Sequence, residues 1–166
     1  MKKIILGLIA TLFIIGCSSD KVDTKNIEAK LVVGKSLETL ALKNQFEKAQ
    51  PLKADTKILI FAFSKDMAHI CNDYFVTQAP TYLADNNAQF VADVSAAPSL
   101  IRSMFILPGL KDFKHTVLLL DDKNVAAPYR KDMDVEKIIV VHVENKSITK
   151  IQTITTEADL KKLIEQ

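Results

Sequence analysis

From residue 57 onward, short continuous apolar runs alternate with longer stretches in which the apolar residues have helical spacing. Lys57–Phe63 is rich in β-branched and aromatic residues, as expected for a strand that is buried on both faces. A helix is predicted to follow, with Ser64 or Asp66 as its N-cap. Its apolar residues recur at i, i+3, i+4, i+7 and i+8 and therefore share one face: Met67, Ile70, Cys71, Tyr74 and Phe75.

Two more strands and one more helix are predicted in the middle of the chain. The strands are Ala88–Val94 and Thr116–Leu120, both largely apolar. Between them, residues 97–107 have helical spacing and are ended by Pro108-Gly109. The predicted apolar face of this helix is Leu100, Ile101, Met104, Phe105 and Leu107. Pro80 either kinks the first helix or starts a short second one, and residues 125–134 are predicted to be irregular.

Both ends of the domain are predicted to be built from hairpins. Residues 138–143 and 147–154 form a C-terminal β-hairpin around the turn at 144–146. A last helix follows, capped by Thr156 with Asp159 at capping-box spacing. At the N-terminal end, residues 32–42 are predicted to be an entry strand or hairpin, with a turn at 43–45 and a short extended piece at 50–52.

This order of elements predicts an α/β fold. Helices that alternate with buried strands indicate a sheet covered on both faces, and right-handed crossovers make its first pair of strands parallel. A terminal antiparallel hairpin with a closing helix resembles the thioredoxin-like fold. The resemblance implies a central mixed sheet with helices on both faces, and a C-terminal β-hairpin and helix.

The first residues have the pattern of a secretion signal. Lys2 and Lys3 precede an apolar run of about 12 residues, which is too short to span a bilayer. The run ends in Ile14-Ile15-Gly16-Cys17, which resembles the lipobox of bacterial lipoproteins. The resemblance implies that the chain is cut before Cys17, that the Cys17 thiol carries a lipid, and that the acyl chains hold the protein to a membrane. An ordinary secretion signal with a chance cysteine, or a short membrane anchor, is the alternative.

The expected organisation follows from this leader. Residues 1–16 are the lipoprotein signal peptide, 17–31 a lipid-anchored flexible tether and 32–166 the thioredoxin-like domain. The expected location is the bacterial cell envelope. By resemblance to Gram-negative sorting rules, Ser18 after the cysteine favours the periplasmic face of the outer membrane.

Composition narrows the classes of function. The chain has 22 Lys+Arg and 20 Asp+Glu, and loss of Lys2 and Lys3 with the leader leaves equal numbers of both. No basic stripe and no Trp remain to bind nucleic acid, so no nucleic-acid partner is expected. With 4 Gly and no phosphate-binding glycine loop, no cofactor is expected. The three histidines lack ligand spacing, so no metal is expected either.

One segment resembles a redox site. In peroxiredoxins a strand that ends in an aromatic pair leads to the peroxidatic cysteine, and Phe61–Cys71 has the same strand-to-cysteine spacing. The resemblance implies that Cys71 is the reactive thiol, with His69 as a cationic neighbour and His115 at the position that matches the family's activating Arg. In this sequence Ala68 stands where the family has a Thr. Arg102 and Arg130 are the candidates for the activating arginine, and the sequence does not show where either lies relative to Cys71.

Two functions from different classes stay open on these grounds. The first is a binding or accessory module of the cell envelope, with an unidentified envelope protein as partner and with Cys71 as a packing residue. The second is a single-cysteine thiol peroxidase or redox protein that uses Cys71, because a lipidated Cys17 leaves no partner for a disulfide within the chain. Whether the protein is an enzyme is open, and the first function is preferred. Asp93 and Ser95 end a parallel strand, at the edge where ligand sites of α/β proteins form, and a salt bridge or a cap for the helix that starts at Ala97 is the preferred interpretation of Asp93.

Overall fold

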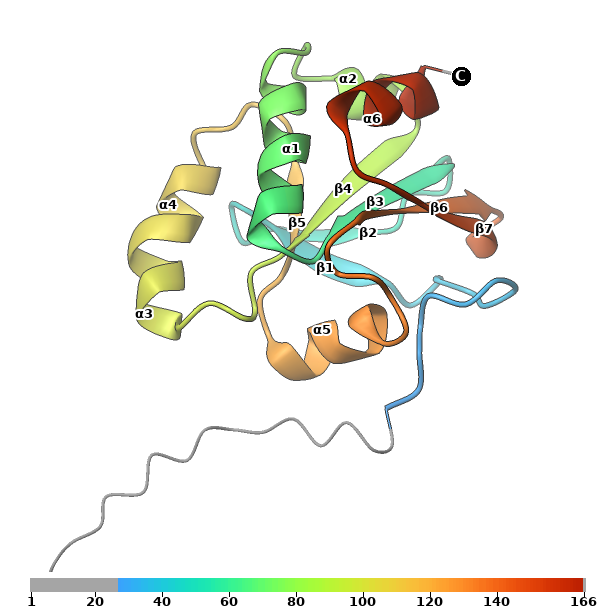
Figure 1. The fold of residues 1–166 in the computed structure, drawn as a ribbon, viewed down its shortest axis with the longest axis horizontal. Helices are drawn as coiled ribbons and strands as arrows, with labels where there is room; N and C mark the ends of the chain where they lie inside the picture. Colours follow the sequence, from blue (N-terminus) through green and yellow to red (C-terminus); the bar gives the residue numbers. More distant parts are fainter. Residues whose placement is uncertain (1–26, 166) are drawn as a thin grey trace, which may run out of the picture.

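A seven-stranded mixed sheet in the order β2-β1-β5-β4-β3-β6-β7 runs through the computed structural model, which describes residues 27–165 (Figure 1). β3, β4 and β5 are parallel and form its centre, and the remaining pairs are antiparallel. The strands are β1 Ala41–Asn44, β2 Ala49–Pro51, β3 Ile58–Ala62, β4 Ala88–Asp93, β5 Val117–Leu120, β6 Ile138–Glu144 and β7 Ser147–Ile154. The predicted α/β sheet with a parallel first pair is confirmed.

Helices cover both faces of this sheet (Figure 1). They are α1 Lys65–Val76, α2 Tyr82–Asp85, α3 Ser99–Ile101, a π-helical segment Arg102–Ile106, α4 Leu107–Leu110, α5 Lys123–Arg130 and α6 Glu157–Ile164. Side chains alternate between the faces along each strand, so the sheet separates two apolar cores. One core packs under α5 and the segment before β1, and the other packs under α1, α2, α4 and α6.

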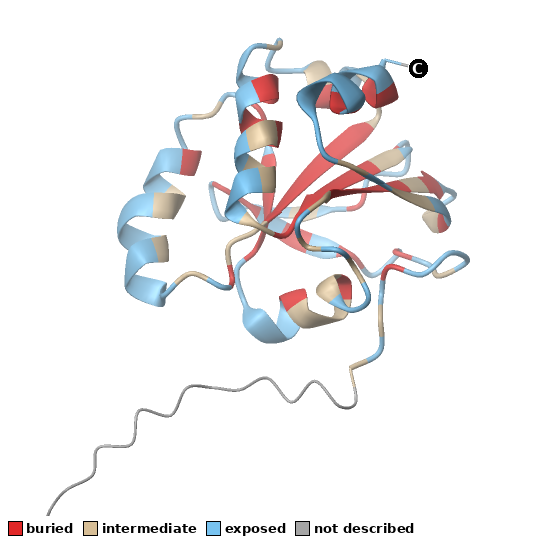
Figure 2. Ribbon diagram, in the orientation of Figure 1, coloured by how far each residue is buried: buried red, intermediate tan, exposed pale blue. Residues whose placement is uncertain are grey.

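The continuous apolar runs are the most deeply buried strands. Leu59, Ile60 and Phe61 of β3 have no exposed surface, and Figure 2 shows the central strands as the buried part of the sheet. On one face Phe61 stacks on Tyr129 of α5, with ring centroids 6.0 Å apart. Burying a large apolar side chain contributes about 1.5–3 kcal/mol, so these positions account for much of the stability of the fold.

The C-terminal hairpin and the final helix agree with the sequence prediction. Asn145 and Lys146 join β6 to β7 with φ of 48° and 62°, the left-handed backbone that a two-residue hairpin turn requires. The Thr156 Oγ1 accepts a hydrogen bond from the Asp159 backbone N–H at 3.1 Å and donates one to the Asp159 carboxylate at 2.6 Å. These contacts make Thr156 the N-cap of α6.

The N-terminal prediction is partly wrong. The first hairpin is β1–β2, and its turn is at residues 45–48, because Asn44 belongs to β1 and pairs with Leu118 of β5. Residues 32–40 make turns and a single bridge, between Ser36 and Ser147. Leu31 is buried, and the Lys30 backbone N–H donates to the Pro128 carbonyl at 2.9 Å, so the packed part of the chain includes these two residues.

The helix predicted over residues 97–107 differs in extent and in packing. It is one helical rod, Ser99–Leu110, which passes through a π-helical turn and continues beyond Pro108 instead of ending there. Pro108 is tolerated because it stands in the first turn of α4. Most of the predicted apolar face is not covered: the exposed side chains are Leu100, Ile101, Met104 and Phe105. The residues that pack on the core are instead Ile106, Leu107 and Leu110.

The segment that was predicted to be irregular contains a helix. α5 begins at the N-cap Asp122, whose carboxylate accepts from the backbone N–H groups of Asn124 and Val125. Pro128 lies inside α5, and the buried side chains Ala126 and Tyr129 hold the helix on the sheet. No helix among residues 27–165 has the length and hydropathy to cross a membrane. Cys17 and the predicted leader lie outside the described residues.

Candidate functional site

Cys71 lies in the interior of the domain. It is the seventh residue of α1, its side chain has no exposed surface, and it is the only cysteine among residues 27–165. It belongs to the apolar core under α1 together with Tyr74 and Phe75. Burial raises the pKa of the Cys71 thiol far above its ordinary value, because the thiolate would lose its hydration. This environment favours the neutral thiol and the packing interpretation of Cys71.

His69 does not adjoin the thiol. Residues two apart in a helix point to different sides, and His69 is exposed whereas Cys71 is buried. The structure therefore does not bring the predicted cationic neighbour to the sulfur.

His115 is a buried neutral side chain that contacts α1. Its Nε2 lies 2.9 Å from the Asn72 Oδ1, and since an amide oxygen only accepts, Nε2 carries the proton. Nδ1 is buried without a hydrogen-bond partner. Desolvation lowers the pKa of His115 to about 4, so the ring is uncharged near neutral pH and does not supply the positive charge of an arginine.

Aromatic rings enclose this histidine. The Phe113 ring is stacked on it at a centroid distance of 5.0 Å, and the Phe75 ring meets it edge-on at 5.5 Å. The His115 carbonyl accepts from the Gln45 side chain at 2.8 Å. These contacts make His115 a packing residue that ties the start of β5 to α1.

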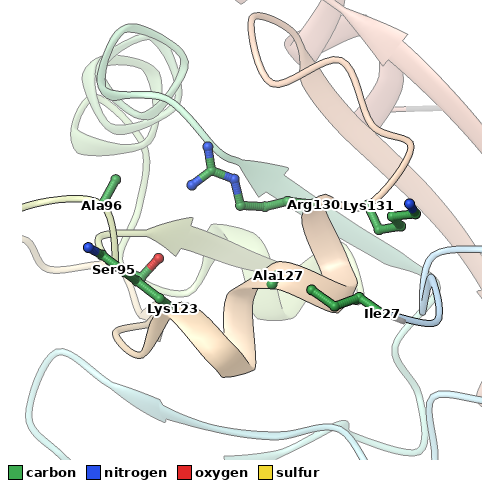
Figure 3. Close-up of a pocket in the computed structure, with 7 residues that line it drawn as sticks. All are labelled: Ile27, Ser95, Ala96, Lys123, Ala127, Arg130 and Lys131. Atoms are coloured by element: carbon green, nitrogen blue, oxygen red, sulfur yellow. The ribbon is translucent and has the colours of Figure 1, made fainter. Parts of the chain in front are cut away.

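A pocket of about 400 Å³ lies at the carboxyl end of β4. Figure 3 shows the Ser95–Ala96 loop on one side of it, Ile27 on the other, and α5 residues between them. The lining residues are Ile27, Ser95, Ala96, Lys123, Ala127, Arg130 and Lys131. Asp93 ends β4 here and Ser95 follows it, at the end of a parallel strand where ligand sites of α/β proteins form. For Asp93 itself the sequence favours a salt bridge or a helix cap.

The pocket is positively charged around one buried acid. The Arg130 Nη1 lies 3.2 Å from Oδ2 of Asp93, whose side chain is fully buried, and the Asp93 Oδ1 accepts from the Ser95 backbone N–H at 2.8 Å. This pair fixes the loop after β4 against α5. Lys123 and Lys131 add two further cations, so the lining suits a ligand that carries a carboxylate or phosphate group.

Only some of the residues in and around this pocket stand out in the sequence. Asp93 and Ser95 were recognisable because a carboxylate at the end of a buried strand is unusual. The sequence does not place Arg130 beside Asp93. It also gives no reason to expect Lys123 and Lys131 in this pocket, because it does not predict α5. Arg102 lies elsewhere, with its guanidinium 3.5 Å from the Ala97 carbonyl. Among residues 27–165, no group of three His, Cys, Asp or Glu side chains could hold a metal ion.

The chain shares its fold with several solved structures. No family model and no curated protein matches the sequence. A SCO1/SenC family lipoprotein from Bacillus anthracis str. Ames is similar with a TM-score of 0.52 and 13% identity over 78% of this chain and 93% of that one. A protein described as the thiol:disulfide interchange protein DsbE, from Chlorobium tepidum, gives 0.52 and 17% over 81% and 94%.

A peroxidoxin, BcpB from Mycobacterium tuberculosis, has a TM-score of 0.51 and 13% identity over 80% of this chain and 94% of that chain. The fold is therefore thioredoxin-like, as the sequence predicted. Identities this low establish the fold and leave the chemistry to the site itself.

Proposed function

We propose that this protein is a lipid-anchored component of the bacterial cell envelope whose thioredoxin-like domain is a non-catalytic binding or accessory module. The leader and Cys17 supply the lipid anchor, and in a Gram-negative source the domain faces the periplasm from the outer membrane. The similarity to a structure described as a SCO1/SenC family lipoprotein supports an anchored thioredoxin-like domain.

The burial of Cys71 carries the non-catalytic part of the proposal. A reactive cysteine needs access to its substrate and a neighbouring cation or helix N-terminus that stabilises the thiolate. Cys71 has no exposed surface and lies two turns into α1, and the predicted site residue His115 is neutral and bonded to Asn72. No group around the sulfur that the structure describes offers the activation that peroxide chemistry requires.

The pocket at the end of β4 is the proposed binding site. It is concave, it has apolar walls from Ile27 and Ala127, and it carries cations from α5. A guanidinium has five donors, and Arg130 directs Nη1 to Asp93. The remaining donors and the two lysines suit an anionic group on the envelope partner.

The alternative is a single-cysteine thiol peroxidase or redox protein that uses Cys71. The peroxidoxin and DsbE structures share its fold, which is the observation in its favour. In that function the thiolate attacks one peroxide oxygen, the O–O bond breaks, and the second oxygen leaves as hydroxide or alkoxide. An external thiol converts the sulfenic acid to a mixed disulfide with loss of water, and a second thiol releases the reduced cysteine.

The rate of oxidation of Cys71 by hydrogen peroxide separates the two functions. The measurement is intact mass of the lipidated chain, in which the lipid blocks Cys17 and leaves Cys71 as the free thiol. Methionines also gain oxygen from peroxide, so the gain that counts is the part that is lost in a variant without Cys71. We expect the native protein to stay reduced and the urea-unfolded protein to be oxidised, because only unfolding exposes the sulfur. A Cys71→Ser variant gives the mass background. Stoichiometric sulfenic acid in the native protein at micromolar peroxide would establish the redox function instead.

A further inference from the structure

The outer side of the helical rod Ser99–Leu110 is an unpartnered apolar surface. Leu100, Met104 and Phe105 are each about 60% exposed (64%, 59% and 64%), and Ile101 is 43% exposed. Their spacing places all four on one side of the rod, whereas the core is contacted by Ile106, Leu107 and Leu110. Figure 2 shows this rod as exposed along most of its length. Large contiguous apolar surfaces of this kind mark interaction sites.

The tether leaves the domain across the pocket from the loop that leads into this rod. Ile27, the first described residue, lines the same pocket as Ala96, which precedes Ser99 by three residues. Ile27 is ten residues after Cys17, so the chain that joins them spans at most about 35 Å. A lipid on Cys17 therefore keeps the pocket side of the domain, where the loop before the rod also lies, within about that distance of the bilayer.

Charges on the same side complement an anionic membrane surface. Lys123, Arg130 and Lys131 surround the pocket between the tether exit and the rod, and Arg102 lies within the rod itself. Of the acids in these segments, Asp93 pairs with Arg130 and Asp122 caps α5, whereas Asp121 and Asp132 are exposed. Basic residues close to a membrane surface are attracted to anionic lipids.

From these observations we propose that the rod Ser99–Leu110 lies on the membrane. Leu100, Ile101, Met104 and Phe105 enter the interface between headgroups and acyl chains, and the cations of the pocket face the lipid phosphates. This inference rests on the lipid anchor of the proposed function and adds a second contact, which fixes how the domain is oriented on the bilayer.

A single indole can report this contact because the chain has no Trp. The probe is Phe105→Trp in the full lipidated chain, reconstituted into phosphatidylcholine vesicles with and without phosphatidylglycerol. We expect its emission to shift to shorter wavelength, more so with phosphatidylglycerol, and to be quenched by lipids brominated on the acyl chains. The control is Val76→Trp. Val76 is also exposed, but it is the last residue of α1 and lies at the other end of the central strands from the pocket. Its emission should stay that of a hydrated indole.

A second variant, Met104→Glu in the Phe105→Trp background, places a charge in the middle of the apolar surface and should abolish both the shift and the quenching. Its exposed position keeps the fold intact, which circular dichroism checks. Co-sedimentation with the vesicles reports the lipid anchor separately.

Sedimentation with an unshifted, unquenched indole would overturn the docking and leave the anchor standing. A shifted indole that brominated lipids do not quench would mean that a protein, such as a second copy, covers the surface, and would also overturn it. Failure to sediment would refute the anchor and the docking together.

Discussion

Buried His115 should make the stability of this domain fall steeply in mild acid. Its neutral ring is held by Asn72 on one nitrogen, while the other nitrogen, Nδ1, faces the core without a partner. Protonation would place both a positive charge and an unpaired N–H in an apolar, aromatic environment. Folding therefore opposes protonation, and the pKa of His115 falls from 6.5 to about 4.

The magnitude follows from the difference in proton binding. The unfolded chain binds a proton at this histidine below about pH 6.5, and the folded chain only below about pH 4. The stability is fully present above the unfolded value and is lost as the pH falls through this window. At roughly 1.4 kcal/mol for each pKa unit, His115 costs the folded state about 3 kcal/mol by the bottom of the window.

The assay is urea unfolding, followed by far-ultraviolet circular dichroism, of the chain from Ser18 at several values between about pH 7 and about pH 4. The comparison is His115→Phe, which keeps an aromatic ring but cannot titrate. Half-buried His142, whose pKa is lowered by burial and by Lys150, titrates in both proteins, as do the carboxylates. We expect the wild type to lose about 3 kcal/mol more than the variant. Parallel pH profiles for the two proteins would refute the reasoning.

Two further changes test local features of the C-terminal part. Thr156→Ala removes the N-cap of α6 and should lower the free energy of unfolding by about 1 kcal/mol in urea titrations, whereas Thr156→Ser keeps the oxygen and should cost much less. Lys146→Gly relieves a side chain at φ 62° in the β6–β7 turn and should raise the free energy of unfolding by about 0.5 kcal/mol. A loss of stability in the glycine variant would show that the turn is not strained.

The sequence predicted the sheet and its closing elements because their signals are local. β3 and β5 are continuous apolar runs and β4 is largely apolar, and short runs of this kind are typical of strands buried on both faces. The hairpin turn needs two left-handed residues, and Asn145 accepts that backbone readily. The capping box at Thr156 is a contact between residues three apart, which the sequence displays directly.

The errors concern features that depend on tertiary packing. Periodicity shows that Leu100, Ile101, Met104 and Phe105 share a face, but it cannot show whether another element covers that face. α5 was missed because Pro128 and several charges mask a helix that is held by its Asp122 cap and by the burial of Tyr129. The ion pair of Asp93 with Arg130 joins residues 37 positions apart, and no pattern within either segment predicts it.

The free energy of burying apolar side chains also explains why the surface of the rod should not stay exposed to water. Most apolar side chains of this size elsewhere in the domain are buried, at a gain of about 1.5–3 kcal/mol each. Four such side chains are exposed on one side of the rod, so covering them with a second surface would gain free energy of burial in the same way. In the proposed function, acyl chains on Cys17 supply attachment but no orientation, because a single tether lets the domain rotate. A second contact at Ser99–Leu110 would fix that orientation, and it would turn the cationic pocket beside the tether toward the bilayer. The ligand of the pocket would then have to reach it along the membrane surface, which favours a partner that is itself bound to the envelope.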